Sequence, residues 1–154
     1  MARGEPEETD KAIREIWRQR LGRWPAESSV PRYSDHGYEG ERVTAIEPAP
    51  FGDGILAEAL LVATRPASPE TVTSALARLR AVTAHRKTDG MDAEAWFTAV
   101  ADELENYPAD VVRQACRDDG REEKWLPSLK DLILRCDRAV RYRRLLRKAL
   151  EAAK

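Results

Sequence analysis

The sequence is poor in cysteine and has no long hydrophobic run. Its 154 residues include only two cysteines, Cys116 and Cys136, and both fall on apolar helical stripes, where a free thiol behaves as a small hydrophobic side chain. We expect them to be reduced core residues. No apolar run reaches the ~18 residues of a membrane span, and the N-terminal stretch MARGEPEETD is acidic. These absences predict a soluble, cytoplasmic protein that makes no membrane contact.

An excess of one charge is also absent, and so are the common catalytic motifs. The 26 Lys and Arg residues balance 27 Asp and Glu to a net charge of -1, so no global field draws the chain onto nucleic acid. The phosphate-binding pattern G-x-x-x-x-G-K-[ST] does not occur. His36 and His85 lack companions at metal-ligand spacing. The acidic stretches DELE (102–105) and REE (121–123) are typical of a solvated surface. We therefore expect no enzyme, no catalytic residue, no metal and no cofactor.

The first third of the chain differs in composition and periodicity from the rest. Residues 9–21 predict a helix with Thr9 as its N-cap and Gly22 as its stop. From Trp24 to Gly54, prolines and glycines recur without a sustained period, which indicates a long irregular connection. The apolar stretch 55–64 fits a buried helix or a strand, and its Ala, Leu and Glu favour a helix. We therefore expect two parts, residues 1–54 and residues 55–154.

Beyond residue 67, helix-start signals and apolar stripes alternate regularly. The predicted N-terminal signals are Ser68 followed by Pro69, Asp92, Pro108, and Ser128 in the pattern SLKD. The first of these helices is expected to end near Lys87, and Gly120 is expected to be the C-terminal cap of the third. The predicted fold class is all-α: a small helical bundle with a long basic C-terminal helix and a Pro/Gly-rich irregular N-terminal connection.

The last predicted helix carries both an apolar seam and a cluster of positive charge. Its apolar residues repeat every seven positions, and Arg143 interrupts them, a pattern that suits a homodimer through this helix. Its distal half is expected to project. Between Arg135 and Lys154 lie eight Lys or Arg residues and two acids. Pairing with the helix dipole accounts for some of this charge. The remainder suits contact with a nucleic-acid backbone or with an acidic protein face.

The stretch KWLPSLKDL (124–132) places a large aromatic directly before the last helix. Trp125 is expected either to close the core as a lid or to stand exposed beside Lys124 and Arg121 as an anchor for a partner. Both interpretations stay open at this point. The candidate partner-binding residues are Arg121, Lys124, Trp125, Arg141, Arg143, Arg144, Arg147 and Lys148.

The succession AWFTAVADELENYPADVVRQACR and KWLPSLKDL resembles small helical phage and prophage proteins, some of them similar to the phage helicase loader/inhibitor family. The likeness covers about residues 68–140. It implies a helical bundle and a non-catalytic adaptor or inhibitor that binds a replication protein such as a replicative helicase. Two alternatives remain: a DNA-binding regulator that uses the basic C-terminal helix, and a phage counter-defence protein that inhibits a nuclease.

Overall fold

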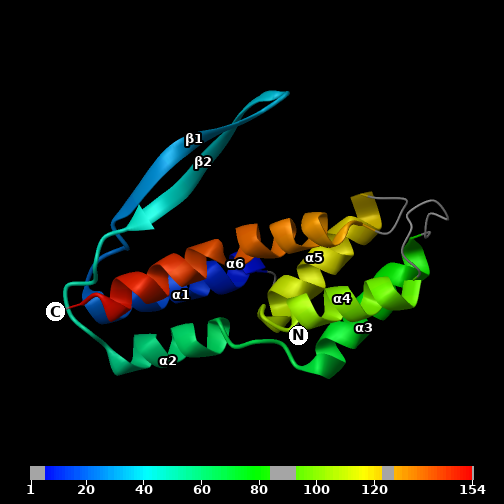
Figure 1. Ribbon diagram of the computed structural model, residues 1–154. Coiled ribbons are helices and arrows are strands. Elements are labelled where there is room, and N and C mark those ends of the chain that lie inside the picture. The colour runs from blue at the N-terminus through cyan, green and yellow to red at the C-terminus, as the bar shows by residue number, and fades with distance from the viewer. Residues whose placement is uncertain (1–5, 84–92, 123–126, 154) are drawn as a thin grey trace. The chain divides into compact units, whose positions relative to one another are not determined.

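A computed structural model describes residues 6–83, 93–122 and 127–153 of the chain. The protein is mostly α-helical, but it also contains a two-stranded antiparallel sheet (Figure 1). The elements are α1 (Pro6–Leu21), β1 (Glu27–Ser34), β2 (Gly37–Ile46), α2 (Gly54–Ala63), α3 (Pro69–Val82), α4 (Ala93–Leu104), α5 (Ala109–Glu122) and α6 (Leu129–Glu151). The strictly all-α prediction is therefore too narrow, because the stretch expected to be an irregular connection forms the sheet.

The chain divides into two compact units, and neither is one continuous stretch. The first comprises the chain up to Glu8 and residues 64–140; the second comprises residues 9–63 and 141–154. The helices α1 and α6 each contribute residues to both units. This division does not coincide with the expected linear one at residues 54 and 55.

The first unit is a helical core whose helix starts follow the sequence signals. Ser68 caps α3 by accepting a hydrogen bond from the backbone N–H of Thr71 at 3.2 Å. Ser128 in the same way accepts from Asp131 N at 3.1 Å and starts α6. Both predicted caps are confirmed. The predicted end near Lys87 and the predicted cap Asp92 lie outside the described residues.

The core of the first unit forms where α3 packs against α5 and α4. Its fully buried side chains include Val72, Leu76, Leu79, Val100, Leu104, Val111, Val112, Leu132 and Cys136. Two polar contacts join distant parts of this core: Trp96 Nε1 donates to the Pro127 carbonyl at 3.0 Å, and the Tyr107 hydroxyl donates to Asp137 Oδ1 at 2.6 Å. Buried polar groups that find partners in this way fix the packing of the core.

Gly120 lies inside α5 rather than at its end, which corrects the predicted C-terminal cap. A Cβ atom placed on Gly120 would lie 2.8 Å from Cγ2 of Val82 and 3.7 Å from Cδ1 of Leu79. The absence of a side chain therefore lets α5 approach α3 closely at this point. The physical reason for the glycine is helix packing, and the helix continues to Glu122.

The second unit contains α1, α2, the two strands and the distal part of α6. Figure 1 shows α1 alongside the distal part of α6. Trp17 and Leu21 of α1 share a buried cluster with Leu56 and Leu60 of α2 and with residues of α6, namely Leu146, Ala149 and Leu150. The distal half of α6 therefore packs within this unit, and the expectation that it projects is wrong. The helix α1 begins at Pro6 instead of Thr9, and it ends before Gly22, whose φ of 79° suits only glycine.

The strands β1 and β2 form a hairpin whose turn residues are Asp35 and His36. Tyr33 pairs with Tyr38, and Ser34 pairs with Gly37, which has a φ of 105°. Near the turn, Gly40 also has a positive φ, of 97°. Register shifts occur between Ser28 and Ser29 and between Pro31 and Tyr33. All eight residues of β1 are exposed, so no layer of the described chain covers this strand.

Candidate functional site: an arginine groove and an exposed hairpin

The predicted partner-binding residues divide into three groups. Lys124 and Trp125 lie outside the described residues, so the choice between lid and anchor stays a prediction. Arg121 is exposed near the end of α5, and Arg141, Arg144, Arg147 and Lys148 are exposed on α6. Arg143 is buried. Arg121 belongs to the first unit, whereas the residues on α6 belong to the second.

Arg143 has no exposed surface, and its side chain holds the second unit together. Its Nε donates to Asp10 Oδ1 at 2.8 Å, and its Nη1 donates to the Ala63 carbonyl at 3.0 Å. The guanidinium thus links α6 to α1 and to the last residue of α2. A side chain with no accessible surface cannot touch a partner in this state, so we remove Arg143 from the candidate residues. Its position in the apolar seam is explained by this internal ion pair.

Much of the remaining charge near the C-terminus is also used within the chain. Arg135 forms ion pairs with Asp119 at 2.9 Å and with Glu122 at 2.5 Å, and Arg147 pairs with Glu151 at 3.0 Å. Arg138, Arg141 and Lys148 are exposed. The region carries a net positive charge, but ion pairs within the chain neutralise part of it, so less of this charge is available to a partner than the sequence suggests.

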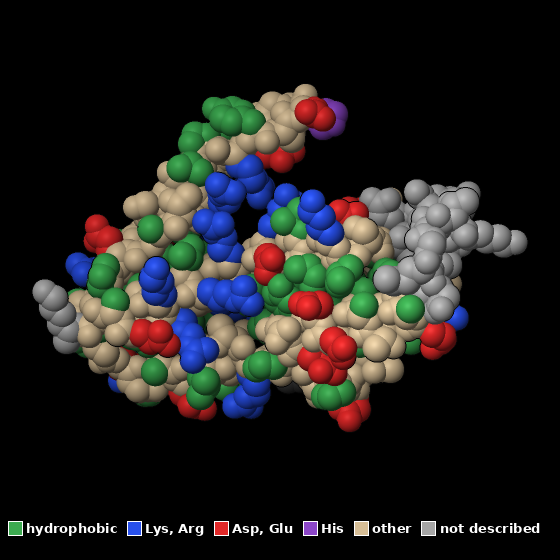
Figure 2. Space-filling view, viewed as in Figure 1, with side chains coloured by type: hydrophobic (Ala, Val, Ile, Leu, Met, Phe, Trp, Pro, Cys, Tyr) green, Lys and Arg blue, Asp and Glu red, His purple; other side chains and the backbone are tan. Residues whose placement is uncertain are grey.

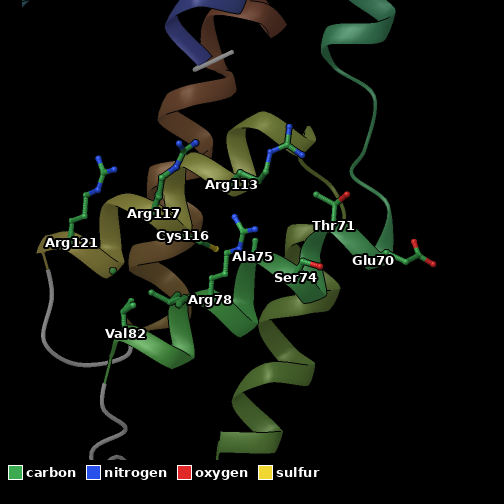
Figure 3. Close-up of a pocket in the computed structure, with 12 residues that line it drawn as sticks. Glu70, Thr71, Ser74, Ala75, Arg78, Val82, Arg113, Cys116, Arg117 and Arg121 are labelled. Carbon is green, nitrogen blue, oxygen red and sulfur yellow. The ribbon is translucent and has the colours of Figure 1, made fainter. Parts of the chain in front are cut away.

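A more concentrated basic site lies in the first unit, in a groove of about 700 Å³ between α3 and α5. Arg113, Arg117 and Arg121 lie in a row along α5, and Arg78 reaches toward them from α3 (Figure 3). Among the described residues that line the groove, Glu70 is the acidic one. Within residues 6–83, 93–122 and 127–153, none of the four arginines forms an ion pair. This groove therefore holds uncompensated positive charge.

The floor of the groove is apolar. Ala75, Leu79 and Val82 of α3 line it together with Cys116 and Gly120 of α5. Thr71 and Ser74 add hydroxyl groups near Glu70. A groove with an apolar floor and arginine walls offers burial to a hydrophobic side chain and charge-assisted hydrogen bonds to an anion.

Sequence reasoning named Arg121 but missed the rest of this set. The available signal was the spacing of Arg113, Arg117 and Arg121, because residues four apart share one helix face. That Arg78 faces them follows only from the packing of α3 on α5, which the sequence does not show.

The hairpin β1–β2 forms a second candidate surface, in the second unit. Tyr33 is 70% exposed and Tyr38 is 60% exposed, and their rings contact edge to face with centroids 5.8 Å apart. Val30 is also exposed, and Figure 2 shows hydrophobic side chains along the hairpin. The Tyr38 hydroxyl donates to Glu41 at 2.9 Å, and this bond raises the pKa of the phenol. Exposed tyrosines are favoured contact residues in protein interfaces.

Two further observations concern the described thiols and metal-ligating side chains. Burial raises the pKa values of Cys116 and Cys136 to about 12, so neither thiol is a ready nucleophile. Among the residues that the structure describes, no three His, Cys, Asp or Glu side chains form a possible metal site. No described helix is long and apolar enough to cross a membrane.

Comparison with known proteins gives no relative: no protein-family model, no curated protein and no solved structure matches this chain.

Proposed function

We propose that this chain is a non-catalytic adaptor or inhibitor that docks on a protein of the replication machinery, such as a replicative helicase. The observation that supports docking most strongly is the uncovered hairpin β1–β2. A two-stranded hairpin is at best marginally stable by itself in water, yet here all of β1 and most of β2 face solvent. A partner that covers the tyrosine pair gives this exposed element a role.

The base of the hairpin is well anchored, which suits a docking element. The Tyr142 hydroxyl of α6 donates to Glu27 at the start of β1, and Arg14 of α1 lies 3.4 Å from the same carboxylate. Glu47 N donates to the Ala26 carbonyl at 2.9 Å just beyond the paired strands. A fixed base limits the conformational entropy that the hairpin loses when a partner binds.

Docking through side chains fits the hairpin better than strand addition. Pro31 lies within β1 and cannot donate a backbone hydrogen bond to an added strand. Charged residues and register shifts also interrupt the two strands, and such features discourage edge-to-edge pairing. The face with Tyr33 and Tyr38 is therefore the expected contact.

We propose a replicative helicase as the partner because residues 68–140 resemble the loader/inhibitor proteins. The chain has no phosphate-binding loop, so its proposed effect on a helicase comes from binding energy and imposed geometry. Such an adaptor changes the ATPase rate or the DNA loading of its partner without turning over ATP itself.

The test combines the full chain with the replicative helicases of its host and of the genetic element that encodes it. Gel filtration is expected to show a stoichiometric complex, and the helicase ATPase rate is expected to change. Tyr33→Ser with Tyr38→Ser should weaken the complex by ~2 kcal/mol or more, the size of an interface hot spot. Phe51→Ser, which removes an exposed aromatic outside the strands, is the matched control. If no complex forms with either helicase, the proposal fails.

The DNA-binding alternative keeps one observation in its favour. Arg141 and Lys148 of α6 are exposed and form no ion pair with a described residue. A regulator that uses this helix would bind duplex DNA with an affinity that falls steeply as salt rises. Replacing Arg141, Arg144 and Lys148 with Gln should then flatten the salt dependence.

A further inference from the structure

We infer that the groove between α3 and α5 binds an acidic protein segment that carries at least one large apolar side chain. This inference rests on the proposed function only in that the partner is a protein. It assigns the first unit a binding site separate from the hairpin of the second unit.

The charge of the groove identifies an anionic ligand. Arg78, Arg113, Arg117 and Arg121 line it, and Glu70 is its acidic lining residue. All four cations are arginines, whose planar guanidinium groups bind carboxylates with two parallel hydrogen bonds. Because none of them is paired with a described residue, a carboxylate ligand does not first have to displace an internal partner among these residues.

The spacing along α5 matches acidic side chains on a peptide. Residues four apart on a helix are separated by ~6 Å along its axis. Carboxylates on alternate residues of an extended segment are ~6.6 Å apart, and those four apart on a helical segment are again ~6 Å apart. Arg113 and Arg117 can therefore each meet one acidic side chain of the same segment.

The floor of the groove favours a peptide over a nucleic acid. Val82 is 63% exposed and presents apolar atoms beside the arginines. A hydrophobic side chain that packs against it is stabilised by leaving water, whereas a phosphate is not. Among the described residues, no aromatic side chain lines the groove, so these residues offer no stacking platform for unpaired bases. The volume of about 700 Å³ is typical of a pocket for a few side chains.

The distribution of charge along the groove also predicts which part of the segment is acidic. Glu70 lies toward one end with Thr71 and Ser74, and Arg121 lies toward the other end (Figure 3). The acidic residues of the ligand should therefore lie along α5, and a neutral or hydroxyl-bonding residue should lie beside Glu70. An acidic ligand residue placed beside Glu70 would be repelled by its carboxylate.

The experiment is a selection of short random peptides displayed on phage against the purified full-length chain. The variant Arg113→Gln with Arg117→Gln is kept out of the selection and is used afterwards to test the enriched peptides. The enriched peptides are then synthesised, and their binding is measured by fluorescence anisotropy at low and high salt. Oligothymidylate and a short DNA duplex are measured in parallel. The matched control is Arg65→Gln with Arg138→Gln, which removes the same charge from exposed positions outside the groove.

We expect the enriched peptides to share acidic residues and a large apolar residue. Their binding should weaken at least about tenfold in the groove variant and stay within about twofold in the control. Arg78→Gln on the opposite helix should also weaken binding of the peptides. If the double variant does not fold, the binding measured with Arg78→Gln tests the groove instead.

Three results would overturn the inference: no acidic and apolar consensus, binding that is equal in the groove variant, or groove-dependent binding of DNA in place of the peptides. None of these results depends on a helicase complex. The inference about the groove can therefore be wrong while the proposed function is right, and the reverse also holds.

Discussion

The two units of this chain reach stability by different routes. The first is a helical core built mainly from residues 64–140, whose helices begin at local capping signals. The second joins residues 9–63 to residues 141–154, and it contains an ion pair between the buried Arg143 and Asp10, 133 positions apart. The second also carries the uncovered hairpin.

The two units differ in how far apart in the sequence their stabilising contacts lie. The first unit follows from helix propensity, caps and apolar stripes, which are properties of neighbouring residues. The second unit needs the two ends of the chain to meet, which costs more loop-closure entropy before its contacts form. Variants that damage one core and spare the other test this distinction.

The largest effect is expected from the core tryptophan of the second unit. Trp17 is 1% exposed, and Trp17→Ala should lower the free energy of unfolding by ~3–5 kcal/mol because it leaves a large cavity. Trp24 is 48% exposed, and the guanidinium carbons of Arg14 and Arg18 each lie 5.4 Å from the centroid of its ring. Trp24→Ala, the matched control, should cost only ~1 kcal/mol. Urea unfolding followed by circular dichroism measures both, and equal losses would contradict the assigned burial.

The second effect comes from the buried ion pair. Asp10→Ala removes a carboxylate that pairs with the buried guanidinium of Arg143, and we expect a loss of ~3 kcal/mol. Adding Arg143→Met removes the stranded charge and should recover most of this loss, because a well-packed apolar side chain often replaces a buried ion pair. Urea unfolding of the two single variants and the double variant completes the cycle. Additive losses in the double variant would show that the two residues do not interact.

The third effect concerns the close approach of α3 and α5. Gly120→Ala places a Cβ atom 2.8 Å from Val82, and this overpacking should cost ~1–3 kcal/mol. Alanine is otherwise the better helix former by ~1 kcal/mol. A stabilised variant would therefore show that the helices separate without cost. The thiols of Cys116 and Cys136 are buried in this unit, so faster labelling with a thiol reagent would report its opening.

The smallest effect belongs to a single cap. Ser68→Ala removes the acceptor for Thr71 N and should cost ~1 kcal/mol. Thr73→Ala, at an exposed site of the same helix, is the control and should change stability by less than ~0.5 kcal/mol. Thermal unfolding compares the two, and a larger loss at Thr73 would contradict the role of Ser68.

Much of the helical part of the fold could be predicted from local signals. Ser68 and Ser128 start helices as expected, and the apolar stretch 55–64 is helical. The hairpin was missed because its strands bury almost nothing, so the period-two alternation of a half-buried strand is absent. The β-formers Val30, Tyr33 and Tyr38 around the Asp35–Gly37 turn were the available signal.

The site residues were harder to predict, because surface charge depends on which charges find partners. Arg143 looked like a surface break in a seam, but its partner Asp10 lies near the other end of the chain. Arg113 and Arg117 were not predicted as site residues, and only the packing of α3 on α5 places Arg78 opposite them. Both errors concern contacts that no sequence window contains.

The central claim is that the hairpin is the docking element, and hydrogen exchange tests it most directly. The full chain is measured by mass spectrometry alone and in complex with the replicative helicase that binds it. We expect exchange to slow across residues 27–46, because a partner that covers the tyrosine face removes water from these amides. A stable complex in which residues 27–46 exchange as fast as in the free chain would contradict the account.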